Sequence, residues 1–311
     1  MKNQPKLSPP AGMTEELCLL APRQLSSLIE FVEQMTLHGA GPDLGAFAEA
    51  WRAAAAVYCE LELTEAGASE HPDIQPLPKS MQAHAARLIG LPAVRKTFDT
   101  VPVALGMVEL DKLIVTQFTL TRAIVDRIGG AFPNPPRPRQ LAELCLPLHG
   151  SNADFRLACK DGKEFTFVSD AHDMRFLTGQ VLSPDNIGAL AVEGHARAVV
   201  ALSVGFSTNL LNVVRFNDRV ALNNGHHRAY ALRSLGVTHV PCVIQACGTR
   251  DELRQAATSE ICDNSDLYFE SPRPPLLRDF DHPALVRSIQ APRLQRQLQL
   301  KVEVQSRLMA V

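Results

Sequence analysis

The sequence predicts an α+β fold, with a small mixed sheet and short helices behind an all-helical N-terminal region. In the first hundred residues, apolar side chains recur at the three- and four-residue spacing of amphipathic helices. After Pro102 the pattern changes to short β-rich runs, bounded by glycine and asparagine turn signals. This change along the chain predicts a helical layer followed by a sheet-containing domain.

The N-terminal region, residues 1–100, is predicted to hold three helices and carries no chemical motif. The first helix ends near Gly39, the second runs from about Leu44 to Ala66, and the third runs from Lys79 to Ile89. We therefore expect this region to be a docking or oligomerisation layer. The apolar face of the first helix is formed by Leu25, Leu28, Ile29, Val32 and Met35.

The central domain is predicted over residues 101–250, with an insertion at about 134–183, and residues 251–311 are predicted to be a helical tail. Asp251 is expected to cap the first helix after this domain. Short helices are expected at Leu120 to Ile128, at Ser183 to Val204 and at about Pro283 to Met309. Strands are expected at Met107 to Val115 and His239 to Ala246, with hairpins at Phe155 to Val168 (turn Asp161-Gly162) and Leu210 to Leu222 (turn Asn217-Asp218).

Composition excludes several classes of protein. The net charge is −2 over 311 residues, so the surface as a whole does not favour nucleic acid, although a local basic groove is compatible with it. The seven cysteines are scattered without a CxxC pair, which predicts neither a zinc ribbon nor a disulfide framework. No apolar stretch is long enough to span a membrane, and the polar N-terminus lacks a signal-peptide core. We therefore expect a cytoplasmic protein.

The most informative segment is Asn224-Gly225-His226-His227-Arg228, which follows a predicted hairpin and opens a helix. Glycine lets a backbone approach a ligand closely, and a helix start presents unpaired N–H groups to an anion. Arg228 offers a planar fork suited to phosphate oxygens, and the helix dipole adds about 1 kcal/mol. The alternative is that Asn223 or Asn224 caps the helix and Arg228 is a solvated first-turn residue. The phosphate interpretation predicts that Arg228→Ala abolishes ligand-induced stabilisation and leaves the fold intact.

The order of strand, turn, Gly-His-His-Arg helix, glycine and Val-Pro-x-Val strand resembles the ParB/sulfiredoxin superfamily of nucleotide-binding domains. The matching segments are Asn224 to Arg228, Leu235-Gly236 and Val240 to Val243, with Val108 to Leu113 similar to the family's opening strand. The resemblance covers roughly residues 102–247. It implies a ParB/sulfiredoxin-like fold and a bound nucleotide such as ATP or CTP with Mg²⁺. Its phosphate-binding candidates are Asn224, Gly225, His226, His227, Arg228 and Gln117.

Two departures from that family bear on chemistry. His226 stands where sulfiredoxins carry the reactive cysteine, which argues against reduction of a sulfinic acid. Asn224 stands where many enzymatic members carry aspartate, and an amide cannot act as a base. Hydrolysis or phosphoryl transfer would be the natural reaction of a nucleotide site. A non-enzymatic DNA-associated or scaffold protein is the alternative function, and a homo-oligomer is expected.

Three acidic residues are candidates for catalysis: Glu109, Asp170 and Asp173. The last two belong to the cluster Ser169 to Arg175, in which two carboxylates and a histidine could bind a metal or transfer protons. A capped helix start is the preferred interpretation of this cluster, because acids favour a first turn and no metal-ligand spacing occurs. His226 and His227 are not expected to chelate one ion, because neighbours on a helix diverge by about 100°. No metal site is predicted.

Overall fold

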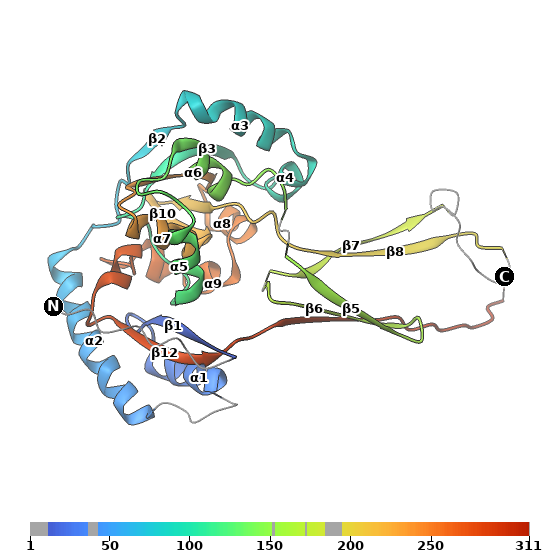
Figure 1. Cartoon of the computed structure of the whole chain (residues 1–311), viewed down its shortest axis with the longest axis horizontal. Coiled ribbons are helices and arrows are strands. Elements are labelled where there is room, and N and C mark those ends of the chain that lie inside the picture. The colour runs from blue at the N-terminus through green and yellow to red at the C-terminus, as the bar shows by residue number, and fades with distance from the viewer. Residues whose placement is uncertain (1–11, 37–42, 151–152, 172, 184–194, 311) are drawn as a thin grey trace. The chain divides into compact units, whose positions relative to one another are not determined.

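The computed structural model of the protein describes residues 12–36, 43–150, 153–171, 173–183 and 195–310 (Figure 1). The chain forms two compact units. The first unit contains Met1–Leu148 and Asn209–Arg293, and the second contains His149–Thr208 and Leu294–Val311. The predicted insertion at about 134–183 overlaps the second unit, which extends to Thr208 and includes the C-terminal strand.

The first unit is built around a mixed five-stranded sheet with the order β10-β9-β11-β3-β2. The parallel pairing of β9 with β11 stands beside antiparallel pairings of β9 with β10, β11 with β3 and β3 with β2. This mixture of helices and a mixed sheet confirms the α+β class. The strands are β2 (Ile74–Pro76), β3 (Val103–Glu109), β9 (Asn212–Phe216), β10 (Arg219–Asn224) and β11 (His239–Ala246).

The core of the first unit lies on both faces of this sheet. In β11 the six consecutive residues 240–245 are all buried, so side chains pointing to either face are covered. The short hairpin β9–β10 turns at Asn217 and Asp218, whose φ angles are 48° and 59°. These left-handed angles suit asparagine and aspartate, and they confirm the predicted hairpin.

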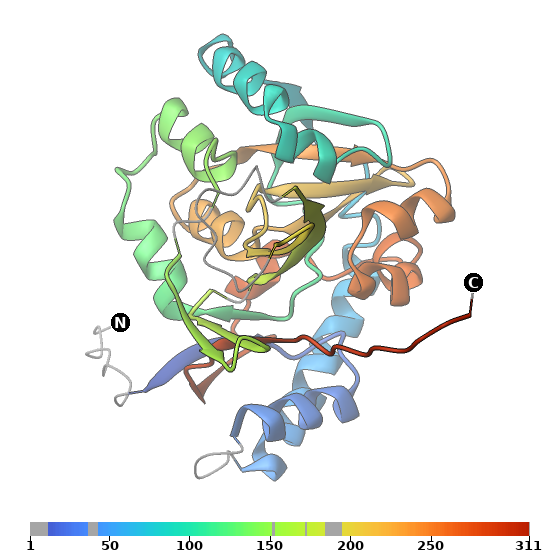
Figure 2. The same cartoon turned by 90° about the vertical axis from the view of Figure 1, so that its right-hand side faces the viewer.

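The second and third predicted helices begin where expected, at Leu44 and Lys79, and α1 begins at Leu25, the first residue of the predicted apolar face. The predicted end of the first helix near Gly39 lies outside the described residues. In the second view α1 and α2 lie side by side (Figure 2). Thr249, rather than Asp251, caps α8, and its hydroxyl accepts the N–H of Glu252 at 3.2 Å. The helices are α1 (Leu25–Thr36), α2 (Leu44–Thr64), α3 (Lys79–Gly90), α4 (Pro92–Thr97), α5 (Arg122–Gly130), α6 (Pro138–Cys145), α7 (His226–Ser234), α8 (Arg250–Ala256), α9 (Ser259–Asp263), α10 (Ser265–Phe269) and the 3-10 helix η2 (Leu277–Asp281).

The N-terminal region is not all-helical, because it contributes β1 (Met13–Leu19) as well as β2. β1 lies between β4 (Thr119–Thr121) and β12 (Val286–Pro292) in a three-stranded sheet. Both neighbours of β1 are antiparallel, and β12 comes from nearly the other end of the chain. Local sequence could not reveal this strand, since its ladder partners are remote.

The predicted helix from about Pro283 to Met309 is wrong, whereas α8, α9, α10 and η2 do lie in the first part of the predicted helical tail, residues 251–311. Residues of the predicted tail helix form β12 and then β13 (Arg296–Lys301). In Gln297-Leu298-Gln299-Leu300, apolar and polar side chains alternate with the period of a strand, and this outweighs their helix propensity. The predicted helix at Ser183 to Val204 is also wrong in its described C-terminal part, because this part belongs to β8 (Val199–Gly205). The β-branched valines of β8 favour a strand. Residues 184–194 of that prediction lie outside the described ranges.

The second unit consists of two small sheets. One has the order β13-β6-β5, with β5 (Phe155–Lys160) and β6 (Glu164–Ser169). The other pairs β7 (Arg175–Leu182) with β8. Asp161 and Gly162 both have positive φ, which confirms the predicted turn between β5 and β6. No helix starts after Ser169, so the expected capped helix is absent from the described part of this segment and the chain enters β7 instead.

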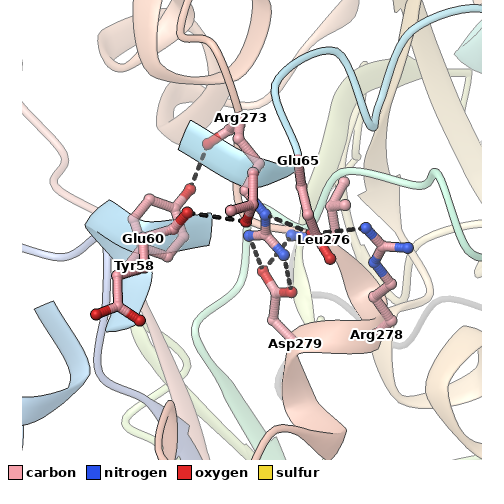
Figure 3. Close-up of polar contacts among 8 residues, drawn as sticks. Tyr58, Glu60, Glu65, Arg273, Leu276, Arg278 and Asp279 are labelled. Carbon is pink, nitrogen blue, oxygen red and sulfur yellow. Dashed lines mark hydrogen bonds and ion pairs between the residues drawn. The ribbon is translucent and has the colours of Figure 1, made fainter. Parts of the chain in front are cut away.

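A buried ion-pair network ties α2 to the chain around η2 (Figure 3). The guanidinium of Arg273 is 1% exposed and donates to both carboxylate oxygens of Asp279, at 2.8 and 2.6 Å. It also donates to Glu65 at the end of α2, at 3.0 Å, and Tyr58 of α2 donates to the backbone oxygen of Arg273. The network therefore fixes the position of α2 through charge-assisted hydrogen bonds. No helix among the described residues is long and apolar enough to span a membrane.

Candidate functional site

The candidate site is the first turn of α7. Gly225 connects this turn to the end of β10. Gly225 is the N-cap residue and has a φ of 104°. A Cβ at this position would lie 3.0 Å from Cγ of Leu211 and 3.3 Å from Nη2 of Arg228. Both the backbone angle and the close packing therefore require glycine here. The predicted position of glycine before this helix is confirmed.

His226 is buried and serves as a hydrogen-bond acceptor. Its Nε2 accepts the backbone N–H of Thr116 at 3.2 Å. The Thr116 hydroxyl lies equally close to Nε2, but it donates its single hydrogen to the carbonyl of Leu222 at 2.8 Å. Burial, and to a smaller extent the charge of His227, lowers the pKa of His226 to about 3. The imidazole is therefore neutral at physiological pH, with its hydrogen on Nδ1.

His227 makes the matching contact at the other end of the same segment. Its Nε2 accepts the backbone N–H of Thr121 at 2.9 Å. The two histidines thus hold the segment Thr116–Thr121 against the start of α7. Gln117 lies within this segment, where its side-chain amide donates to the carbonyl of Thr119 at 2.6 Å. The structure therefore brings the segment that carries Gln117 to the helix start, while the Gln117 side chain itself bonds within that segment.

Arg228 is buried, and its hydrogen bonds reach oxygens of two other segments. Nη1 donates to the carbonyls of Leu144 at 3.1 Å and Asn209 at 2.6 Å. Nη2 donates to the side-chain oxygen of Asn209 at 3.2 Å. Arg228 thus joins the end of α6 to the residues before β9. The alternative of a solvated first-turn arginine is wrong, and these three bonds indicate a positioning role.

The side chains of the two asparagines before the glycine form hydrogen bonds with other segments and not with the start of α7. Asn224 donates through Nδ2 to the carbonyl of Leu210 at 3.0 Å. Asn223 donates to the carbonyl of Ala256 and accepts the N–H of Thr258. Neither caps α7, which has no side-chain cap. The amides at the start of α7 therefore receive no capping oxygen from these side chains.

Glu109 is not brought to this turn. Its carboxylate accepts the N–H of Asp73 at 2.9 Å, and its backbone pairs with His239, which follows α7. Two residues further on, Asp111 accepts a hydrogen bond from Arg233 in the last turn of α7. Because eight residues of helix span about 12 Å, Glu109 lies near the end of α7 that is remote from Gly225.

Asp170 and Asp173 belong to the second unit, where each has a partner within that unit. Asp173 accepts the N–H and the hydroxyl of Ser207, at 3.1 and 2.7 Å. Asp170 accepts the side-chain amide of Gln295 at 2.9 Å. His172 of the same cluster lies outside the described residues. Both aspartates thus bond segments that flank β8 and β13.

Among the described residues, no group of three or more histidine, cysteine, aspartate or glutamate side chains is arranged to hold a metal ion. A small cavity of about 180 Å³ lies elsewhere in the first unit, between the chain after β1 and α2. It is smaller than the roughly 300–1,000 Å³ of a typical ligand pocket. Its wall includes Arg23, Trp51, Tyr58 and Glu62.

The residues that sequence reasoning missed are the partners of the motif: Thr116, Thr121, Leu144 and Asn209. Three of them act through backbone groups, which leave no mark in a sequence. Asn209 also accepts through its side-chain oxygen. The one sequence signal for this residue is its type, because asparagine tolerates the left-handed φ of 50° that Asn209 adopts. Comparison of the chain with protein-family models, with curated proteins and with solved structures finds no match.

Proposed function

We propose that this protein binds a phosphorylated ligand, most simply a nucleotide, at the start of α7. The observation that carries the proposal is the convergence of three segments on the first turn of this helix. His226 and His227 hold the segment Thr116–Thr121, and Arg228 holds the chain around Leu144 and Asn209. Such a first turn is a fixed surface with glycine at its entrance, which is the arrangement that anion sites on helices use.

The charge balance of the turn favours an anion. The nine-residue helix α7 directs its positive dipole end toward Gly225, and the first turn contains no acidic residue. His226 is neutral and adds no charge, whereas the guanidinium of Arg228 remains charged at any physiological pH. In the proposed complex the backbone amides of the first turn donate to phosphate oxygens. Arg228 positions the surrounding segments and contributes long-range attraction.

The ligand class comes from the order of elements. Hairpin β9–β10, helix α7 and strand β11 come in this order along the chain, after β3 and the elements β4 to β8, and this order supports the resemblance to ParB/sulfiredoxin-like domains. That resemblance implies ATP or CTP with Mg²⁺ as the ligand to test first. Catalysis is not part of the proposal, because Glu109 lies near the far end of α7 and Asn224 bonds to the backbone of Leu210.

Hydrogen–deuterium exchange with and without ligand tests the proposal directly, because the proposed donors are backbone amides. The full-length protein is incubated with ATP, CTP, pyrophosphate or inorganic phosphate, each with and without Mg²⁺. We expect slower exchange in peptides that cover Asn223–Leu232, and in those that cover Thr116–Thr121. A ligand that slows exchange elsewhere and leaves these peptides unchanged would overturn the proposal, as would the absence of any effect at millimolar ligand.

Two arginine variants make this experiment more specific. Arg228→Lys keeps the positive charge but loses the planar fork, so we expect ligand affinity to fall about tenfold. Arg254→Ala is the matched control, because Arg254 is 69% exposed and, among the described residues, its ion pair is with nearby Asp251. The control should bind as the natural protein does. Equal affinity in all three proteins contradicts a role for Arg228.

A second function, nucleic-acid association, is favoured by a basic surface on α3 and α4. The twenty residues from Lys79 to Phe98 contain no aspartate or glutamate. Their four cationic side chains, Lys79, Arg87, Arg95 and Lys96, are all exposed. None of the four forms an ion pair with another residue in the described ranges. Such uncompensated cations are suited to phosphate groups of a nucleic-acid backbone.

Salt dependence tests this second function. Duplex DNA binding is measured by fluorescence anisotropy over a range of salt concentrations. Each phosphate contact contributes about 0.9 to the slope of log K against log salt, so Lys96→Gln should lower the slope by about 1. Lys301→Gln, which removes an exposed lysine of the second unit, should leave the slope unchanged. Absence of binding at low salt rejects this function.

A further inference from the structure

The second unit lacks a core of its own in the part of it that the structure describes. Only Ser169 and Met174 are buried there. Both clusters of buried apolar residues are made of first-unit residues. Small sheets of two or three strands need a covered apolar face to be stable in water. The strands of the second unit therefore expose surface that a partner could cover.

Strand β5 is the most exposed strand of this unit. All six of its residues are exposed, including Phe155 at 48% and Leu157 at 55%. β5 is the edge of the sheet β13-β6-β5, and in the described residues its outer side pairs with no strand. An exposed, apolar edge strand is a template for pairing with another chain.

The apolar residues of β5 continue a stripe across the sheet. Cross-strand partners share a face, and Leu157 faces Phe167 of β6, which in turn faces Leu298 of β13. Phe155 and Cys159 lie on the same face as Leu157, since alternate residues of a strand do. The stripe ends at the free edge of β5, where a further strand with the same alternation would extend it.

We propose that β5 pairs with β5 of a second copy of this chain, antiparallel and centred on Leu157. A twofold axis perpendicular to the sheet keeps the apolar faces of the two copies on the same side. Under that symmetry each residue faces a partner residue of the same parity. Leu157 then faces the partner's Leu157, and Phe155 faces the partner's Cys159.

Charge decides between this register and its neighbours. Centring on Leu157 places Asp154 opposite the partner's Lys160, twice by symmetry, and both side chains are exposed. A shift to Ala158 would instead place Arg156 opposite the partner's Lys160. A shift to Arg156 would oppose two arginines. Opposite charges stabilise a cross-strand pair and like charges destabilise it, so the register centred on Leu157 is favoured.

The first test is the dissociation constant of the dimer, measured by sedimentation velocity on the full-length protein. Leu157→Asp places two carboxylates opposite each other and should make the protein monomeric. Val181→Asp is the matched control, because Val181 is 72% exposed on β7, in the other sheet of the unit. The control should remain dimeric. A natural protein that is monomeric at all concentrations overturns the proposal, as does a Leu157→Asp protein that still dimerises.

Charge reversal tests the register. Lys160→Asp places the new aspartate opposite the partner's Asp154 at two symmetry-related positions. The dissociation constant of the dimer should therefore rise about tenfold or more. The double variant Asp154→Lys with Lys160→Asp should return it to near the natural value. Within one chain Asp154 directly precedes β5 and Lys160 ends it, which in extended backbone separates them by roughly 20 Å, so rescue requires the partner. Failure of the rescue contradicts this register.

Disulfide trapping gives an independent readout. Leu157→Cys with Cys159→Ala should form an intermolecular disulfide on mild oxidation, because facing Cα atoms lie within reach of one. Ala158→Cys with Cys159→Ala is the control. In the proposed register two such cysteines are about 8 Å apart, beyond disulfide range. Crosslinking of the control alone would overturn the register.

Discussion

His226 and Thr116 form one of the contacts that fix the candidate site: Nε2 of the buried imidazole accepts the backbone N–H of Thr116 at 3.2 Å. A protonated imidazole carries hydrogen on both nitrogens and cannot accept this bond. Protonation would therefore break the contact and leave a charge buried at the positive end of a helix. The bond between His226 and the start of the segment Thr116–Thr121 consequently persists only while His226 is neutral.

The contact predicts that stability falls as the pH is lowered. Burial lowers the pKa of folded His226 to about 3, whereas an unfolded histidine has a pKa of about 6.5. Between these values the unfolded chain binds the extra proton, so the free energy of unfolding decreases by up to about 1.4 kcal/mol per pH unit. Urea denaturation at pH values of about 7, 6 and 5 measures this slope, above the range in which most carboxylates titrate.

His226→Gln is the control for this slope, because an amide oxygen can accept the same N–H and does not titrate. In this variant the slope of the unfolding free energy against pH should be smaller by the contribution of about one proton over that range. An unchanged slope in His226→Gln would mean that other groups cause the acid sensitivity.

Gly225→Ala should destabilise the protein more than Gly236→Ala does. Both glycines have positive φ, 104° and 75°, so alanine is strained at each position by about 1–2 kcal/mol. At Gly236 no described residue beyond the two adjacent ones has an atom within 4 Å of the added Cβ, whereas at Gly225 the Cβ meets Leu211 at 3.0 Å. Overpacking should add about 1 kcal/mol or more at Gly225. Equal costs in urea denaturation would show that the packing around Gly225 relaxes freely.

Asp279→Ala should cost about 3–5 kcal/mol, because it removes a partner of a buried guanidinium. Asp279 is 3% exposed, accepts two bonds from Arg273 and also accepts the N–H of Leu276 at 2.8 Å. Asp251→Ala removes an exposed carboxylate that also pairs with an arginine, and it should cost at most about 0.5 kcal/mol. Thermal denaturation of both variants compares the two pairs. A small loss for Asp279→Ala would mean that Glu65 alone can compensate Arg273.

Local signals in the sequence predicted the elements that depend on neighbouring residues. The periodicity of α1, α2 and α3, the two hairpin turns and the glycine before α7 are of this kind. Strands β1, β12 and β13 were missed because their stability comes from ladder partners far along the chain. The site divides in the same way. The position of Gly225 follows from local rules, whereas the partners of His226 and Arg228 are set by tertiary packing.

Arg228→Ala is the variant on which sequence and structure disagree. From the sequence alone, it is expected to remove ligand binding and leave the fold intact. In the structure, Arg228 is the common donor to Leu144 and Asn209, so its removal leaves buried oxygens without this donor. We therefore expect a loss of about 3 kcal/mol without any ligand present, and faster amide exchange in Leu210–Asn212. Arg254→Ala should cost almost nothing, since Arg254 is largely exposed. If Arg228→Ala is as stable as Arg254→Ala, the three bonds contribute little to stability, and ligand assays on Arg228→Ala report binding. If it is destabilised as predicted, those assays report unfolding as well as binding, and Arg228→Lys becomes the informative variant.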